Sequence, residues 1–206
     1  MQIASTLEKT AYITFDDGPQ ESTYSLLDLM NNLDVRATFF VLEPQMRKYK
    51  DLICTMMQYG HAIGLHGVSH DRKIYSSPDA FIEEMNICNH TLKEITGANS
   101  RLVRAPYGSY PNMNSEFKGA VREAGYILWD WNVDSNDWWM SADECISLSK
   151  IQILTLQNQG LAPIILFHDH TTNIKEVVGS IIKFLKYHNY SVKPLTPDLI
   201  PICHGE

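Results

Sequence analysis

The sequence has no excess of positive charge and no long apolar run. Lysine and arginine number 17 in 206 residues, against 24 aspartates and glutamates, which gives a net charge of -7. Without a basic run or a basic face, the chain is not expected to bind nucleic acid. No apolar stretch approaches the roughly 18–20 residues needed to span a bilayer, so we expect no membrane-spanning segment.

The sequence also lacks any Cys-x-x-Cys pair, linker, repeat or low-complexity segment. A chain of 206 residues with 44% hydrophobic content can build its own core and needs no disulfide framework. We expect most of the cysteines to be small buried apolar residues; they are Cys54, Cys88, Cys145 and Cys203. These absences together predict one domain over residues 1–206.

The N-terminal residues 1–6 lack a basic stretch followed by an apolar one. We therefore expect no signal peptide in this chain. Two locations stay open on these residues: the cytoplasm, or the outside of the cell as a domain of a longer exported protein.

Strand and helix patterns alternate along the chain. Short apolar runs predict strands at residues 12–15, 37–41, 61–65, 102–103, 126–129, 163–167 and 190–192. Helical spacing of apolar residues predicts helices over about 22–33, 44–59, 77–97, 114–125, 143–157 and 174–185. Such alternation indicates parallel strands covered by helices. Because several strands end in polar residues, we expect a distorted (β/α) barrel with about seven parallel strands rather than a doubly wound sheet.

Two adjacent carboxylates follow the first strand. In Thr14-Phe15-Asp16-Asp17-Gly18-Pro19 the apolar strand ends at the aspartates, and the Gly-Pro pair then turns the chain away. Neighbouring strand side chains point to opposite faces, so Asp16 and Asp17 need not do the same work. Keeping both ionised at close range requires a cation, an arginine or both. The alternative is a strand-to-turn junction with solvated acids.

His66 and His70 lie four positions apart in one predicted loop. At this spacing, two imidazoles can converge on one ion. Two histidines and one carboxylate form a three-ligand set for catalytic zinc that leaves a position open for water. Asp17 is the candidate for the third ligand. The alternative is a polar loop with two solvated histidines.

Five segments occur in the order and rough spacing of a known family. They are Thr14–Pro19, His66–His70, Arg104–Gly108, Asp134–Trp138 and Leu166–His168. These segments resemble the five motifs of the polysaccharide deacetylases with a NodB-homology domain, carbohydrate esterase family 4, over residues 12–192. The resemblance implies a metal-dependent hydrolase. Its expected reaction removes N-acetyl groups from an N-acetylglucosamine-containing polysaccharide, peptidoglycan or a chitin-like glycan.

The resemblance also implies roles for residues of the first and third motifs. Asp16 would be the general base, and Asp17 a metal ligand. Arg104 would pair with Asp16 and orient it; a surface arginine is the alternative. The backbone N–H of Tyr107 would help to hold the oxyanion of the tetrahedral intermediate, with the metal as the main stabiliser of its charge.

The fifth motif implies that His168 is the general acid that protonates the leaving amine. That role requires an imidazolium, and a nearby carboxylate raises the pKa of a histidine. In the fourth motif the carboxylate stands directly before a tryptophan, which indicates Asp137, with Asp134 as the second choice. The alternative for His168 is a histidine that is only hydrogen-bonded at a strand end.

Aromatic and aliphatic residues of these motifs are expected to bind substrate. Trp131, Trp138 and Leu166 would form the wall of an apolar pocket for the acetyl methyl group, and plain core packing is the alternative for each. Tyr110 and Trp139 are candidates for stacking on sugar rings at the rim.

One position departs from the family's pattern. A serine or threonine usually follows the first histidine of the second motif, whereas this chain has Gly67. The missing hydroxyl would steady the loop by bonding the second histidine. With Gly67 either the loop is more flexible, or Ser69 makes the contact instead. Both histidine ligands remain.

We expect zinc as the cofactor, and cobalt or manganese would support the same chemistry. The expected partner is a carbohydrate polymer, bound by a monomer. The family mostly works outside the cytoplasm, so we expect a secreted or cell-surface location as part of an exported protein, with the cytoplasm still open. The alternative functions are an O-acetyl esterase acting on xylan-type polysaccharide and a catalytically inactive glycan-binding domain.

Overall fold

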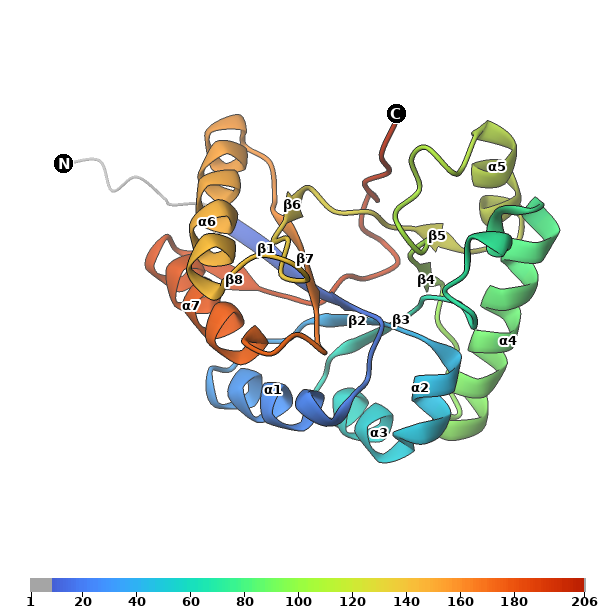
Figure 1. The fold of residues 1–206 in the computed structure, drawn as a ribbon, viewed down its shortest axis with the longest axis horizontal. Helices are drawn as coiled ribbons and strands as arrows, with labels where there is room; N and C mark the ends of the chain where they lie inside the picture. The colour runs from blue at the N-terminus through green and yellow to red at the C-terminus, as the bar shows by residue number, and fades with distance from the viewer. Residues whose placement is uncertain (1–8, 206) are drawn as a thin grey trace.

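Parallel strands form one curled sheet in the computed structural model, which describes residues 9–205 (Figure 1). The strands in this range are β1 Lys9–Asp16, β2 Thr38–Val41, β3 Ala62–Leu65, β4 Leu102–Val103, β5 Ile127–Leu128, β6 Val133–Asp134, β7 Ile164–His168 and β8 Tyr190–Val192. They pair in the order β5-β4-β3-β2-β1-β7-β6, and β8 pairs with the start of β1. The predicted distorted (β/α) barrel with about seven parallel strands is confirmed. Residues 1–6, in which we expected no signal peptide, lie outside the described range.

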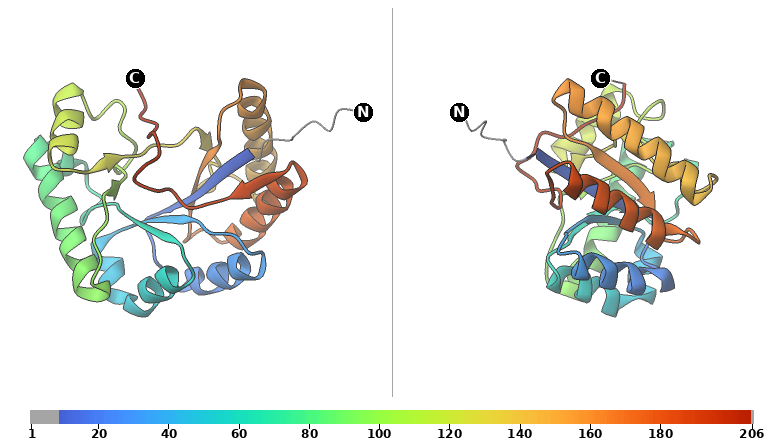
Figure 2. Two further views of the ribbon diagram at one scale, coloured as in Figure 1. Left: turned by 180° about the vertical axis from the view of Figure 1, so that it is seen from behind. Right: turned by 90° about the vertical axis from the view of Figure 1, so that its left-hand side faces the viewer.

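Helices cover the outer side of the curled sheet (Figures 1 and 2). They are α1 Glu21–Asn32, α2 Glu43–Lys48, α3 Lys50–Gln58, α4 Pro78–Thr96, α5 Ser115–Glu123, α6 Ala142–Gln159 and α7 Ile174–Tyr187, with the short 3-10 helix η1 Arg72–Tyr75. Within residues 9–205, no helix is both long enough and apolar enough to cross a membrane.

Three elements differ from the sequence prediction. The helix expected over residues 44–59 is two helices, because the backbone of Tyr49 leaves the helical region (φ -122°, ψ 52°). Residues 133–134, expected in a loop, form β6 because they pair with β7. Gln20 caps α1, and its N–H donates to Oγ1 of Thr23 at 2.8 Å, so Thr23 lies inside the helix.

The apolar core has two parts, one on each side of the sheet. Alternate strand residues face opposite sides, so β2 gives Phe39 to the larger part under the helices and Phe40 to the smaller part. Trp129 and Leu195 belong to the smaller part, which fills the concave side of the sheet. The barrel interior is therefore packed with side chains.

The C-terminal segment passes between the two free edges of the sheet, β5 and β6 (Figure 1). The Leu195 N–H donates to Oγ1 of Thr38, and the Asp130 N–H donates to the carbonyl of Ile202, each at 2.8 Å. These bonds attach the segment to the concave side of the sheet. The segment thus covers the opening that the incomplete barrel leaves.

All four cysteines are free, in agreement with the absence of a disulfide pattern. Cys88 and Cys145 are buried, as expected for small apolar residues, whereas Cys54 and Cys203 are partly exposed. The expectation of burial is therefore correct for two of the four.

The strand register gathers polar residues at one rim. Asp16, the last residue of β1, is level with His168 of β7. The ends of β3 and β4 are also level with each other, so His66 and Arg104 leave the sheet side by side. The carboxyl ends of parallel strands share one edge of a sheet, and this edge holds the candidate residues.

Candidate active site

The end of β1 places its two aspartates in different positions. Asp16 belongs to the strand and is buried, whereas Asp17 follows with a left-handed backbone (φ 73°) and is partly exposed. The chain then turns at Gly18, where any side chain would overlap the carboxylate of Asp169. Asp16 and Asp17 can therefore meet different partners.

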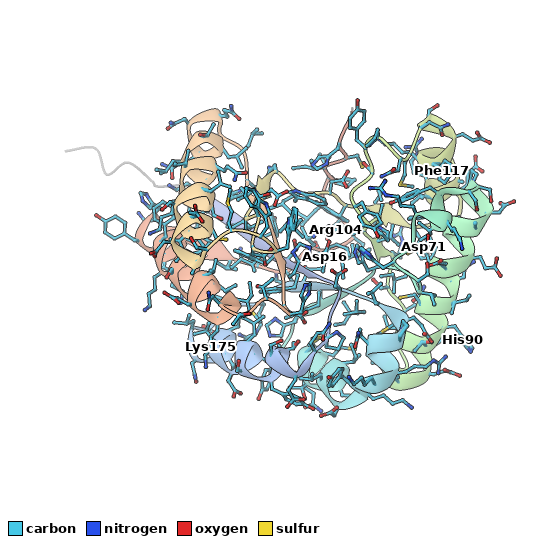
Figure 3. The ribbon with its side chains drawn as sticks, in the orientation of Figure 1. Asp16, Asp71, His90, Arg104, Phe117 and Lys175 are labelled. Atoms are coloured by element: carbon cyan, nitrogen blue, oxygen red, sulfur yellow. The ribbon has the colours of Figure 1, made fainter. Side chains whose placement is uncertain are left out.

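A buried arginine holds Asp16, and the two side chains point toward each other (Figure 3). Nη1 of Arg104 donates to Oδ1 of Asp16 at 2.9 Å and to Oγ1 of Thr14 at 2.7 Å. Its Nε and Nη2 donate to the carbonyls of Trp129 at 3.1 Å and Asp130 at 3.0 Å. A fully buried guanidinium is tolerated only when it is paired and hydrogen-bonded. These bonds fix the orientation of the Asp16 carboxylate.

Asp17, His66 and His70 bring three ligand atoms together, each within 4.8 Å of the others. Oδ1 of Asp17 lies 3.4 Å from Nε2 of His66 and 3.3 Å from Nε2 of His70. This oxygen is buried and has no hydrogen-bond partner among residues 9–205. Nδ1 of His66 lies 2.9 Å from the carbonyl of Arg104, so Nδ1 carries the proton and Nε2 faces the cluster as an acceptor. A buried carboxylate oxygen without a donor, beside two imidazole nitrogens, fits a divalent cation such as zinc.

The charges around the cluster also suit a cation. Burial alone would raise the pKa of Asp17, but the adjacent histidines outweigh it and lower that pKa. Burial lowers the pKa of His70. Burial would also lower the pKa of His66, but the charges of Asp16 and Asp17 raise it. A cation binds the carboxylate and the neutral imidazole, so its binding would release any proton held at His66.

Glu84 of α4 holds the loop between the two histidines. Its carboxylate accepts hydrogen bonds from the N–H of Val68 at 2.8 Å, the N–H of Ser69 at 3.0 Å and the hydroxyl of Ser69 at 2.7 Å. Gly67 has a left-handed backbone (φ 91°), and a Cβ there would lie 3.0 Å from Oε2 of Glu84. Ser69 thus bonds Glu84, and it does not make the contact with His70 that the sequence suggested. Glu84 restrains the loop in its place.

Tyr107 packs against the second histidine. Its hydroxyl donates to the carbonyl of His70 at 2.8 Å, and the two ring centroids are 4.6 Å apart. Its backbone is left-handed (φ 63°), and its backbone N–H donates to no acceptor within residues 9–205. A strained backbone that presents an unused donor is typical of a binding or catalytic site.

His168 forms a second polar unit with Asp137. Nδ1 of His168 lies 2.8 Å from Oδ1 of Asp137, and the backbone N–H of His168 donates to Oδ2 at 2.7 Å. Burial alone would lower the pKa of His168, but the hydrogen bond and charge of Asp137, with the charges of Asp16 and Asp17, raise it to about 9. Asp134, the second choice for this contact, instead accepts hydrogen bonds from groups of its own loop.

The predicted pocket residues lie in different surroundings. Leu166 is buried in β7, while the partly exposed ring of Trp131 has its centroid 5.6 Å from the guanidinium of Arg104. Trp138 is 65% exposed and lines a cavity together with Trp139. Core packing therefore does not account for Trp138.

The sequence does not indicate three acids that the structure places at or near the site: Glu84, Asp130 and Asp169. Asp130 is fully buried and accepts the backbone N–H of Ser109 at 3.0 Å. Asp169 accepts the hydroxyl of Thr23 at 2.5 Å, and burial raises its pKa to about 7. The sequence carries only weak signals for them. Asp130 and Asp169 closely follow strands, and Glu84 lies on the apolar face of its helix.

Comparison with known proteins gives consistent matches. A family model described as polysaccharide deacetylase matches residues 4–129. The Bacillus subtilis protein YheN is 35% identical over 198 residues, which cover 95% of this chain and 70% of that protein. A peptidoglycan-N-acetylglucosamine deacetylase from Bacillus cereus is 33% identical over 186 residues, 88% of this chain and 67% of the relative. The crystal structure of the polysaccharide deacetylase Bc1974 from Bacillus cereus is similar with a TM-score of 0.86 and 31% identity, covering 95% of this chain and 97% of that one.

Proposed function

The chain belongs to the polysaccharide deacetylase family, carbohydrate esterase family 4, and from this premise we propose that it deacetylates N-acetylglucosamine in a polysaccharide, with peptidoglycan as the first candidate. A relative named as a peptidoglycan-N-acetylglucosamine deacetylase supports this substrate. The observation that carries the proposal is the arrangement at one rim of Asp16 with Arg104, His168 with Asp137, and the Asp17 cluster.

We assign the metal site to Asp17, His66 and His70, with zinc as the ion. The orphaned buried oxygen of Asp17, the acceptor Nε2 of His66 and the nearby Nε2 of His70 support this donor set. A divalent cation bound there lowers the pKa of water and polarises a carbonyl oxygen. Cobalt or manganese would bind to the same ligands, so metal analysis of the purified protein is the measurement that identifies the ion.

Asp16 accepts the proton of the attacking water. Its Oδ1 is occupied by Arg104, while Oδ2 faces the cluster and lies 3.8 Å from Nε2 of His66. A general base must lie within hydrogen-bond reach of the proton it removes, directly or through one water. A water beside the cluster can therefore give its proton to Oδ2 as its oxygen bonds to the acetamide carbon.

His168 donates the proton that the leaving nitrogen needs. With a pKa of about 9, its ring is protonated at neutral pH. Asp137 holds Nδ1, so Nε2 delivers the proton when the carbon–nitrogen bond breaks, and the products are acetate and an amine. The unused backbone N–H of Tyr107 can donate to the oxyanion formed before that step.

Four residues are proposed to bind the acetylated sugar, Tyr107 through its backbone N–H. Tyr107 and Trp138 are about half exposed or more, and Trp131 lies next to the buried Arg104. Leu166 immediately precedes the last two residues of β7, so its apolar side chain is close to the acid. We assign these residues to contacts with the acetyl group and the adjacent ring.

The protein is further proposed to work as a monomeric single domain outside the cytoplasm, as part of an exported protein. The location is proposed because the polymers named above lie outside the cell. Fractionation of cells that carry the gene tests the location, and size-exclusion chromatography tests the monomer.

Acetate release is the direct test of the proposed function. We expect release from peptidoglycan and chito-oligosaccharides, its loss with a chelator, and its return with zinc. Asp16→Asn should reduce release by about 10²–10⁴-fold while the metal stays bound. Faster release from acetylxylan that survives His168→Ala would identify an O-acetyl esterase, because an ester leaving group needs less help from an acid. Absence of release from all three substrates would leave only glycan binding.

A further inference from the structure

One peptide unit at the rim, between Pro106 and Tyr107, has different partners at its two ends. Its N–H, on Tyr107, donates to no acceptor within residues 9–205. Its carbonyl oxygen, on Pro106, accepts a hydrogen bond from the hydroxyl of Tyr75. The unit is a trans peptide, so its N–H and its C=O point in opposite directions. A group that fixes the carbonyl therefore also fixes the direction of the N–H.

Tyr75 is itself held in place by the core. It is the last residue of η1, the short helix that follows the loop carrying His70. Its ring centroid lies 6.3 Å from that of Phe81 on α4 and 6.3 Å from that of Phe117 on α5, which Figure 3 labels. Burial is the main cause that raises the pKa of Tyr75 above the ordinary tyrosine value, so the hydroxyl keeps its proton and remains a donor at neutral pH.

The turn that follows Tyr107 is fixed as well. The N–H of Ser109 donates to Oδ1 of the buried Asp130 at 3.0 Å, and the Ser109 hydroxyl donates to Oδ2. Tyr107 has a left-handed backbone, which a non-glycine residue keeps only where its surroundings impose it. Tyr75 supplies this constraint at the carbonyl before Tyr107, and Asp130 supplies it two residues later.

The unused N–H of Tyr107 is the proposed donor to the oxyanion of the tetrahedral intermediate. Such a donor is effective when it is oriented before the charge develops. We propose that Tyr75 is a positioning residue of this reaction: its bond to the Pro106 carbonyl directs the Tyr107 N–H toward the oxyanion. The same bond polarises the peptide unit, which makes the N–H a stronger donor. This inference rests on the proposed function, because the oxyanion belongs to that reaction.

Tyr75→Phe tests the proposal, because it removes the hydroxyl and keeps the packed ring. We expect kcat for N-acetylchitotetraose to fall about 5- to 30-fold, less than the roughly 10²–10³-fold effect of removing an oxyanion donor, because the N–H is still present. KM should be nearly unchanged, since the lost alignment matters only when the oxyanion forms. Affinity for a methylphosphonamidate analogue, whose tetrahedral phosphorus replaces the acetyl carbonyl carbon, should fall by the same factor as kcat.

Tyr126→Phe is the matched control. Tyr126 is 7% exposed, and its hydroxyl donates to Oδ1 of Asn86 at 2.7 Å, so this variant also loses one hydrogen bond below the surface. Both variants should have a slightly lower Tm than the wild type and an unchanged zinc affinity. Only Tyr75→Phe should lose kcat and affinity for the analogue.

An unchanged kcat in Tyr75→Phe would overturn the proposal. An equal loss in Tyr126→Phe, or a loss of zinc that accounts for the lost turnover, would overturn it as well, because either would indicate a general structural role. If the wild-type protein releases acetate and Tyr75→Phe behaves like the control, the inference fails and the proposed function stands.

Binding of the phosphonamidate, followed by calorimetry, separates the inference from the proposed function. If the wild-type protein releases no acetate but binds the analogue, and Tyr75→Phe weakens that binding, the proposed function fails and the positioning role stands. Absence of both acetate release and analogue binding in the wild-type protein would overturn both.

Discussion

The two polar units of the rim differ in what they need to be complete. The proposed metal unit consists of Asp17, His66 and His70 with Tyr107 packed against them. In it, Oδ1 of Asp17 is buried without a hydrogen-bond partner in the described part of the chain, 3.3 Å from the nearest imidazole nitrogen. In the acid unit, both oxygens of Asp137 are hydrogen-bonded to His168. A buried polar atom without a partner costs about 1–3 kcal/mol. The metal unit therefore has an unmet need that a cation would satisfy, whereas the acid unit is preorganised by the chain alone.

The backbone shows the same difference. Asp17, His70 and Tyr107, all in the metal unit, have left-handed backbones with φ between 47° and 73°. His168 is an ordinary residue at the end of β7. Left-handed non-glycine residues cost roughly 1–3 kcal/mol each and persist only where their surroundings fix them. The metal unit thus has most of its left-handed residues in loops, whereas the acid unit joins a strand residue, His168, to Asp137, which lies in a turn.

Among substitutions in the two units, removal of a metal ligand should cause the largest loss of acetate release. We expect His66→Ala to lose both the ion and measurable acetate release, a larger loss than the 10²–10⁴-fold contribution of a general base. A chelator should lower the Tm of the wild-type protein but not of the variant, because saturation at 100 times Kd stabilises a protein by about 2.7 kcal/mol. Metal analysis and thermal melting measure both effects.

His90→Ala is the matched control for that variant. His90 lies on the outer side of α4 (Figure 3), where its side chain is 71% exposed and pairs with Glu94. It should keep its ion and its activity. An active His66→Ala protein without metal would contradict the assignment of the ligands.

Substitution of the proposed base separates binding of the ion from chemistry. Asp16→Asn keeps the shape of the side chain, and the bond from Arg104 can still reach its amide oxygen. We expect metal content near that of the wild type and a 10²–10⁴-fold loss of kcat. Metal analysis and kinetics on the same preparation give the answer, and near-normal turnover would remove Asp16 from the mechanism.

The acid unit should respond to pH. Burial alone would lower the pKa of His168, but Asp137, with smaller contributions from Asp16 and Asp17, raises it to about 9, so the protonated acid is present below that pH and is lost above it. The stabilisation from the pair follows the same sign: it is complete below the ordinary histidine pKa of about 6.5 and disappears as pH rises through 9. In Asp137→Asn the alkaline limb of the profile of kcat against pH should move toward pH 6.5. This shift reduces kcat at pH 8 by roughly 10–30-fold.

Profiles of kcat against pH measure this shift. Below about pH 6 the variant and the wild type should converge, because His168 is mostly protonated in both. Asp134→Asn is the control, since Asp134 bonds its own loop rather than His168. An alkaline limb that stays in place in Asp137→Asn would show that another group sets it.

The sequence predicts those parts of the site in which neighbouring residues of one short segment specify the position of a side chain. Asp16 and Asp17 end an apolar strand, and the strand register then brings Asp16 level with His168. The choice of Asp137 over Asp134 came from the order of residues in the fourth motif, and the hydrogen bonds agree with it. Strand ends in a parallel sheet share one edge, so a linear pattern is enough to predict their meeting.

The parts that escaped prediction depend on contacts between distant segments. β6 is only two residues long and exists because β7 lies beside it. Glu84 lies 15 residues from Ser69 in the chain, and only the packing of α4 against the loop brings them together. The C-terminal segment covers the open side of the sheet through bonds to Thr38 and Asp130. None of these contacts has a local pattern that specifies its partner.

Substitution of Glu84 should have the smallest effect on turnover and a clear effect on retention of the ion. Its carboxylate accepts three hydrogen bonds from Val68 and Ser69. Glu84→Gln leaves one acceptor oxygen and removes the charge, so the loop between the ligands loses part of its restraint. Loss of a group that orients metal ligands typically weakens metal affinity by about 10–100-fold. We expect that loss for zinc, measured by competition with a chelator, with kcat at saturating zinc within about twofold of the wild type.

Glu83→Gln provides the control, because Glu83 is the exposed neighbour on the same helix. It removes the same charge from α4 without touching the loop, so a loss of zinc affinity in both variants would indicate a general effect of charge. A loss confined to Glu84→Gln would explain how this chain does without the family's hydroxyl at position 67. Glu84 occupies the space beside Gly67, where a Cβ would lie 3.0 Å from its carboxylate. The metal unit would then owe its geometry to a helix outside the five motifs, whereas the acid unit is built entirely within them.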